Sequence, residues 1–209
     1  MVLCRFLGNA CLELISEKDH IIIDPVFISQ PNKGIESIFL THHHSDHVNL
    51  EKINEIRINF LKEGKELEIY GPECIHDEFN LDFTLILPGS KIDLNNGSVE
   101  VFENNCWKAE GCVAYLVEIE GKKILHTADS ADYSGELNRI KHEINYCFVA
   151  CFEDNFYDYL GFLKNLKPNT AIPYHFATEK DESAKKLAEF LKENKINSKF
   201  LAIGEEFEL

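Results

Sequence analysis

Four histidines and an aspartate lie within seven residues, in the segment Thr41-His42-His43-His44-Ser45-Asp46-His47. Neutral imidazole and carboxylate groups are the ligands that divalent metals such as zinc select. In an extended backbone, residues i and i+2 point to the same side, so His42 and His44 can reach one metal ion together. Asp46 and His47 are offset from them and can reach a second ion. Two ions about 3.5–4 Å apart would hold a bridging hydroxide and polarise a substrate oxygen.

A run of histidines can also form an exposed loop without a function. Two features of this segment argue against that interpretation: the offset of Asp46, and the apolar run Ile38-Phe39-Leu40 that precedes it. An amphipathic segment begins after it, near Leu50, so a strand would lead into the loop and a helix would lead out. Burying four imidazoles without partners would be costly. The segment therefore predicts a metal site or a hydrogen-bond network.

Two further candidate ligands follow predicted strands later in the chain. Asp129 comes after the strand predicted at 123–126 and fits a carboxylate that bridges two ions. His175 comes after the strand predicted at 170–173 and fits the last imidazole. Taken singly, Asp129 could be a turn residue and His175 could open a helix, but the histidine-rich loop favours the ligand interpretation of both. Asp46 and His47 are the candidate catalytic residues, with Asp46 as a metal ligand and proton acceptor.

Asp24 ends the apolar run Ile21-Ile22-Ile23 and precedes Pro25. Two interpretations are open. It could be a turn-starting aspartate that bonds its own backbone, or a buried carboxylate that orients a metal-binding residue. Its position alone favours the turn.

The elements that must position these residues follow from hydrophobic periodicity and turn signals. Strands are predicted at 2–7, 11–15, 21–23, 35–40, 66–70, 83–87, 91–94, 99–103, 112–119, 123–126, 146–152, 170–173, 199–203 and 206–209. Helices are predicted at 50–61, 72–79, 155–166 and 179–193. No linker or change of composition divides the chain, so a single domain over 1–209 is expected. Two mixed β halves with helices outside would make an α/β fold, a four-layer αββα sandwich, which is compatible with this pattern but not required by it.

Charge and composition narrow the classes of partner. The chain has 21 basic and 36 acidic residues, a net charge of −15. This field repels phosphate backbones, so we expect a small-molecule substrate and not a nucleic acid. No apolar run approaches the ~20 residues of a membrane span, and nothing resembles a signal peptide. The seven cysteines include no CxxC pair, which favours reduced thiols in a cytoplasmic protein. The oligomeric state is left open.

With these residues in place, the chain resembles the metallo-β-lactamase superfamily over almost its whole length. His42-x-His44-x-Asp46-His47 resembles the HxHxDH signature, and Asp24 matches the family's aspartate after an early strand. The segments Leu7-Gly8-Asn9-Ala10, Thr127-Ala128-Asp129-Ser130 and Pro173-Tyr174-His175 resemble, in order, its N-terminal turn, its Gly-Asp-Thr motif and its final histidine. The chain is most similar to short members such as L-ascorbate 6-phosphate lactonase. The resemblance implies an αββα fold, one or two ions of Zn²⁺ (or of Mn²⁺ or Fe), and usually hydrolysis.

One position departs from the family pattern. The family places another histidine after the strand that matches 99–103, but here the sequence is Glu103-Asn104-Asn105-Cys106-Trp107. Cys106 could supply a thiolate ligand, or Asn105 could supply a weak carbonyl oxygen. Alternatively, only a second site fills, through Asp46, His47, Asp129 and His175. Cys106 could also be a small apolar residue beside Trp107. Asn104 has the weakest claim because it leaves the strand first.

Three functions follow from this ligand set. The leading hypothesis is a metal-dependent hydrolase in which a metal-bound hydroxide attacks an ester, lactone, amide or phosphoester of a small molecule. The missing histidine motivates an alternative, a metal-binding protein with weak or lost catalysis that serves in sensing or interaction. A di-iron redox protein ranks lowest, because the sequence shows no flavin-binding domain.

Overall fold

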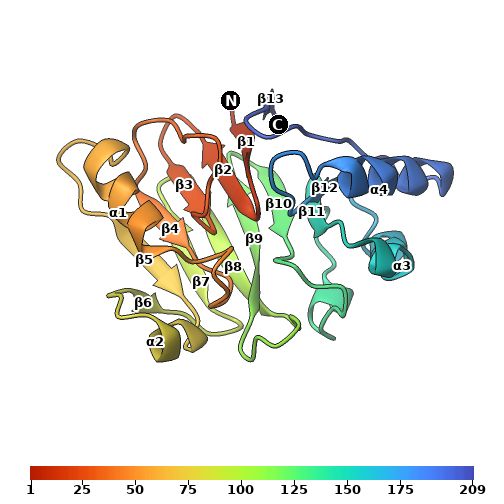
Figure 1. Ribbon diagram of the computed structural model, residues 1–209, viewed down its shortest axis with the longest axis horizontal. Helices are drawn as coiled ribbons and strands as arrows, with labels where there is room; N and C mark the ends of the chain where they lie inside the picture. The colour runs from red at the N-terminus through yellow and green to blue at the C-terminus, as the bar shows by residue number, and fades with distance from the viewer.

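The computed structural model describes residues 1–209 and contains two mixed β-sheets that pack face to face, with helices on their outer sides (Figure 1). The predicted four-layer αββα sandwich is confirmed. Along the chain, the first half forms most of one sheet and the second half forms the other.

The first sheet has seven strands in the order β13-β1-β2-β3-β4-β5-β6. Its β13-β1-β2-β3 part is antiparallel, and β3-β4-β5-β6 is parallel. In the parallel part, the carboxyl ends of the strands lie at the same edge of the sheet, so the loops that follow these strands lie close together. The strands are β1 (Leu3–Gly8), β2 (Cys11–Ile15), β3 (His20–Ile23), β4 (Ser37–Phe39), β5 (Glu68–Gly71), β6 (Thr84–Leu85) and β13 (Glu206–Glu208).

The second sheet has six strands in the order β12-β11-β10-β9-β8-β7. The β7-β8-β9-β10 part is antiparallel, and β10-β11-β12 is parallel. Each sheet therefore contributes a parallel edge from which loops leave in the same direction. The strands are β7 (Lys91–Leu94), β8 (Gly97–Glu103), β9 (Val113–Ile119), β10 (Lys122–His126), β11 (Tyr146–Ala150) and β12 (Thr170–Tyr174).

The helices cover the two outer faces. In Figure 1, α1 lies beside β4 and β5, and α3 and α4 lie beside β11 and β12 at the opposite end. The helices are α1 (Leu50–Asn59), α2 (Cys74–Glu78), α3 (Phe156–Leu166) and α4 (Glu182–Glu193), with short 3-10 turns η1 (Leu137–Arg139) and η2 (Glu153–Asn155). No helix is long and apolar enough to cross a lipid bilayer.

Alternation along the strands separates two cores. In β3, Ile21 and Ile23 point into the large core between the sheets, and Ile22 points outward to the smaller core under α1. There it joins Ile53 and Ile56, which share one face of α1 at i, i+3 spacing. Every residue of β3 is buried. Its isoleucines occupy both faces of the strand, as expected for a central strand of a sandwich.

Two sequence-based predictions are wrong. Residues 199–203 do not form a strand; only Glu206–Glu208 pairs, with β1. The segment is held instead by isolated backbone bonds, such as Lys199 N–H to the carbonyl of Ala171 at 3.0 Å. The expectation of reduced thiols holds for five cysteines, which are free, but not for Cys106 and Cys112, which form a disulfide.

His126, the last residue of β10, links the two sheets. Its ring is completely buried, and Nε2 donates to the carbonyl of Ala10, in the β1–β2 turn, at 3.1 Å. Nδ1 accepts from the backbone N–H of Ala128 at 3.3 Å. The neutral ring satisfies both bonds, whereas a protonated Nδ1 would lose its acceptor role. Burial lowers the pKa of His126 to about 4.

This depressed pKa predicts that acid destabilises the protein. A histidine in the unfolded chain has a pKa of ~6.5, so between pH 7 and pH 5 the unfolded chain binds a proton that the native chain does not bind. The free energy of unfolding must therefore decrease as the pH is lowered from 7 to 5, and His126 accounts for about 2 kcal/mol of this decrease. Urea unfolding of metal-free protein at the two pH values measures it. In His126→Gln, the free energy of unfolding should change less between the two pH values than in the wild type. His76→Gln, at an exposed histidine, is the control and should change as the wild type does. An equally large change in His126→Gln would contradict the assignment to His126.

Candidate metal centre

The candidate residues meet where the parallel edges of the two sheets face each other. Asp24 follows β3, the histidine-rich loop 41–47 follows β4, Asp129 follows β10 and His175 follows β12. Because the carboxyl ends of parallel strands lie at the same edge, the loops that leave them converge. The cap of α1 ends the loop: the side chain of Asn49 accepts from Lys52 N–H at 3.1 Å. Every predicted ligand therefore lies within one region, and each comes from a strand end as expected.

His42, His44 and Asp129 form a first candidate metal position. Nε2 of His42 lies 3.0 Å from Nδ1 of His44 and 3.7 Å from Oδ1 of Asp129. The two side chains point to the same side, as the i, i+2 spacing predicts, and their joint binding of one ion stays a prediction. Burial, reinforced by the neighbouring histidines, holds the pKa of His42 far below its usual value. His42 is therefore neutral, which is the form that can bind a metal.

Asp46, His47 and His175 form a second candidate position. Nε2 of His175 lies 3.2 Å from Nε2 of His47 and 3.4 Å from Oδ2 of Asp46. The hydrogen bond from His175 lowers the pKa of Asp46 well below its usual range, so Asp46 is a carboxylate. His43 belongs to neither group.

Asp129 lies between the two positions. Its Oδ1 faces His42, and its Oδ2 lies 3.8 Å from Nε2 of His47. Oδ1 is buried yet has no hydrogen-bond partner. A buried carboxylate oxygen without a partner is costly, and a cation shared with the imidazoles would supply the missing interaction. The donor set therefore fits one or two divalent metal ions.

The Asp24 carboxylate orients His47. It is completely buried; Oδ2 accepts from His47 Nδ1 at 2.7 Å and from the Thr41 hydroxyl at 2.8 Å, and Oδ1 accepts from the Thr41 N–H at 2.8 Å. None of these bonds is to its own turn, so the turn interpretation is wrong. The pairing places the proton of His47 on Nδ1 and leaves the Nε2 lone pair for a metal. Burial opposes the charged ring, but the carboxylates of Asp24, Asp129 and Asp46 together outweigh it and raise the pKa of His47.

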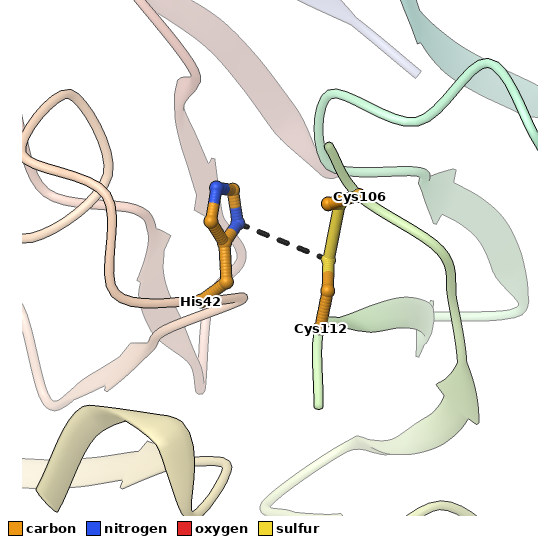
Figure 2. A group of neighbouring side chains, drawn as sticks. All are labelled: His42, Cys106 and Cys112. Carbon is orange, nitrogen blue, oxygen red and sulfur yellow. Dashed lines mark hydrogen bonds between the residues drawn. A yellow bond between two sulfur atoms is a disulfide. The ribbon is translucent and has the colours of Figure 1, made fainter. Parts of the chain in front are cut away.

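The segment without the expected histidine brings cysteines to the site. Cys106 forms a disulfide with Cys112, and Cys112 Sγ lies 3.8 Å from Nδ1 of His42 (Figure 2). The ligand atom of Cys106 lies within 4.8 Å of those of His42 and Cys112 but is not grouped with His44 or Asp129. Cys106 is not a free thiol in this structure, and its ligation of a metal stays a prediction. Asn104 is directed elsewhere, since its Nδ2 donates to the carbonyl of Thr127 at 2.8 Å. Asn105 is exposed beside the site, and its ligation stays a prediction.

Sequence reasoning missed Cys112. A signal for it was present, because the predicted strands 99–103 and 112–119 are neighbours along the chain. If they pair as antiparallel strands, their joined ends lie close together; Cys106 follows the first strand by three residues, and Cys112 opens the second. In the structure β8 and β9 pair in this way, and the Cα atoms of Cys106 and Cys112 are 6.0 Å apart.

A cleft of about 540 Å³ opens beside the candidate positions. Trp107 and Phe152 supply aromatic surface, and Asp129 and Cys106 belong to its lining. Trp107 is 76% exposed, which is unusual for so large an apolar side chain. A second hollow of about 460 Å³, which contains His175, adjoins the other side of Phe152. The site is therefore accessible to a small molecule.

The sequence and the fold are similar to known proteins. A family model described as "Beta-lactamase superfamily domain" matches residues 4–175, a span that contains every candidate ligand. A UPF0173 metal-dependent hydrolase of Staphylococcus aureus (strain MRSA252) is 28% identical over 203 residues, covering 83% of this chain and 85% of that protein.

Two solved structures have the same fold at low identity. The metallo-beta-lactamase fold protein YhfI from Bacillus subtilis gives a TM-score of 0.78 at 14% identity, with 100% of both chains covered. Igni18, a metallo hydrolase from the archaeon Ignicoccus hospitalis, gives a TM-score of 0.77 at 14% identity, covering 100% of this chain and 99% of that one. The predicted resemblance is confirmed.

Asp24→Asn should destabilise the metal-free protein by about 3 kcal/mol. The amide would present a donor where the carboxylate accepts from both His47 and Thr41, and a buried polar group would be left unsatisfied. Urea unfolding at pH 7 measures the change. Asp77→Asn on exposed α2 is the control and should shift stability by less than ~0.5 kcal/mol. Equal stabilities of the two variants would refute the role given to Asp24.

Proposed function

The chain belongs to the beta-lactamase superfamily domain family, and from this premise we propose that it is a metal-dependent hydrolase. The observation that carries the proposal is the convergence of imidazoles and carboxylates on Asp129, whose buried Oδ1 lacks any partner. The ligands we assign are His42, His44, Asp46, His47, Asp129 and His175. The naming of the Staphylococcus aureus relative as a metal-dependent hydrolase supports the same activity.

A divalent metal at these positions would lower the pKa of water and polarise the substrate bond, and Zn²⁺ fits the nitrogen and oxygen donors, with Mn²⁺ or Fe as the other candidates. Side chains of the protein supply the other roles in the proposed reaction. Asp24 holds the His47 ring so that Nε2 faces the site. The Asp46 carboxylate, bonded to His175, accepts the proton of the attacking water. Trp107 and Phe152 offer exposed aromatic surface in the cleft against which the apolar part of a substrate would pack.

The cleft points to a small, uncharged substrate. No lysine, arginine or histidine contributes to the 540 Å³ cleft, whereas Asp129 and Asp132 do. Outside the metal positions, a phosphate group in this cleft would find no cationic side chain to pair with, so we favour an ester, lactone or amide over a phosphoester. The net charge of −15 likewise disfavours a nucleic-acid substrate. We also assign a cytoplasmic location, which five free cysteines support.

Metal content is the first measurement. Protein purified without chelator should hold at least one ion per chain by elemental mass spectrometry. Chelation followed by dialysis should abolish hydrolysis, and added Zn²⁺ should restore it. Far less than one ion per chain, of any metal, would exclude the proposed mechanism.

His47→Ala should lower kcat/KM by about 10³-fold or more, because it removes a ligand of the second position and the partner of Asp24. The assay is a panel of esters, lactones, amides and phosphoesters. His76→Ala, on exposed α2, is the matched control and should keep wild-type turnover. Metal binding without turnover on the whole panel would favour the alternative, a metal-binding protein with weak or lost catalysis, which the missing histidine motivates.

A further inference from the structure

We propose that the hydroxyl of Thr41 fixes the tautomer of His42, so that the single buried carboxylate of Asp24 directs a histidine Nε2 into each of the two candidate metal positions. Thr41 is a positioning residue, because it acts through His42 and contacts no substrate. The hydrogen-bond assignment concerns the metal-free protein. Its consequence for metal binding rests on the proposed function, since it concerns the same ligands.

Thr41 is completely buried, and each of its polar groups has a partner. Its backbone N–H donates to Oδ1 of Asp24, which follows β3 of the first sheet, at 2.8 Å. Its carbonyl accepts from the N–H of Val113, which opens β9 of the second sheet, at 3.1 Å. Backbone bonds toward both sheets therefore fix where the hydroxyl of Thr41 lies.

The hydroxyl of Thr41 carries one hydrogen, and Asp24 takes it. Oγ1 of Thr41 lies 2.8 Å from Oδ2 of Asp24, and a carboxylate oxygen can only accept. With its hydrogen used in this way, Oγ1 offers only lone pairs to its other neighbours. One of these neighbours is Nδ1 of His42, at 3.0 Å. This contact is a hydrogen bond only if Nδ1 of His42 carries a hydrogen.

The other neighbour of this nitrogen leads to the same tautomer. Sγ of Cys112 lies 3.8 Å from Nδ1 of His42 (Figure 2), and in the disulfide with Cys106 it has no hydrogen to donate. Both groups beside Nδ1 are therefore acceptors. The form of a histidine that binds a metal has one ring hydrogen, and in His42 it lies on Nδ1. Nε2 then keeps its lone pair on the side of His44 and Asp129.

Asp24 therefore orients two histidines, one for each metal position. His47 donates directly from its Nδ1 to Oδ2 of Asp24 at 2.7 Å. His42 is linked to the same oxygen through the hydroxyl of Thr41. Substitution of Thr41 should then disturb His42 and leave His47 its direct bond, whereas substitution of Asp24 should disturb both rings.

Nitrogen NMR of the metal-free, ¹⁵N-labelled protein tests the assignment, because imidazole nitrogens with and without a hydrogen resonate far apart. The signals of His42 are identified by their loss in His42→Gln. In the wild type, His42 should be entirely the Nδ1–H tautomer. Thr41→Ser keeps the hydroxyl and should give the same spectrum. Thr41→Val removes it and should populate the Nε2–H tautomer, since Nδ1 of His44 is then a nitrogen acceptor 3.0 Å from Nε2.

Asp24→Asn should reverse the tautomer of His42 without touching its ring. The backbone N–H of Thr41 needs an acceptor, so the amide oxygen takes the place of Oδ1 and the amide nitrogen takes the place of Oδ2. That nitrogen donates to the hydroxyl of Thr41, whose own hydrogen then turns to Nδ1 of His42. His42 should become the Nε2–H tautomer. This measurement decides even if Thr41→Val does not fold, as judged by circular dichroism.

A Zn²⁺ titration follows the same signals, with Nε2 of His42 reporting the first position and Nε2 of His175 the second. Thr41→Val should weaken binding at the first position by about 10- to 100-fold and leave the second unchanged. Thr41→Ser should bind as the wild type does. Thr127→Val is the matched control: it removes another buried threonine hydroxyl, which donates to the carbonyl of Phe148 at 2.9 Å, and should keep the wild-type tautomer and both affinities.

Several outcomes would overturn the proposal. One is an Nε2–H tautomer of His42 in the metal-free wild type; another is an unchanged tautomer in Thr41→Val and Asp24→Asn. Equal weakening of both positions in Thr41→Val, or a tautomer change in Thr127→Val, would show a general loosening of the site instead. In each of these cases the hydrolase proposal stands. If the wild type has the predicted tautomer but binds no Zn²⁺, the hydrolase proposal fails and the hydrogen-bond assignment stands.

Discussion

The buried carboxylate of Asp24 is the constraint on which the site depends. A completely buried charge is tolerated only where hydrogen bonds replace water, and here Thr41 and His47 supply all three. The same bonds fix Thr41, where the histidine-rich loop begins, and orient the ring of His47, where it ends. Because Asp24 follows β3 and Thr41 follows β4, the pairing of two parallel strands determines where the loop begins. The direction of the ligands is thereby coupled to the register of the sheet.

The second sheet holds the other side of that loop. The hydroxyl of Tyr115, in β9, donates to the carbonyl of Leu40, and Val113 N–H donates to the carbonyl of Thr41 at 3.1 Å. Tyr174 in turn donates to the carbonyl of Ala128, next to Asp129. Asp24, Ala128 and His175 all have positive φ, at 50°, 49° and 70°. Non-glycine residues adopt this conformation at a cost, and its repetition at three site positions indicates that packing holds the ligand-bearing loops in place.

The two metal positions are unequal. The second has two imidazoles and a carboxylate, and its histidine His47 is held by Asp24. The first has the same kinds of donor, but its His42 has no carboxylate on the far side of the ring and instead lies 3.8 Å, at Nδ1, from Sγ of Cys112.

The sequence by itself determined the ligand types, their order and the strand-loop context of His42, His44, Asp129 and His175, because residue type and periodicity are local properties. The same periodicity predicted the strands and helices, apart from the misassigned strand at 199–203, but it was only compatible with the αββα architecture, which the family resemblance implied. Only the tertiary structure decided the role of Asp24, the bond between Cys106 and Cys112, and the link of His126 to Ala10. Each of these depends on burial, or on a contact between two segments that come together only when the chain folds. Local patterns carry no information about which polar atoms lose water, and that loss makes these contacts necessary.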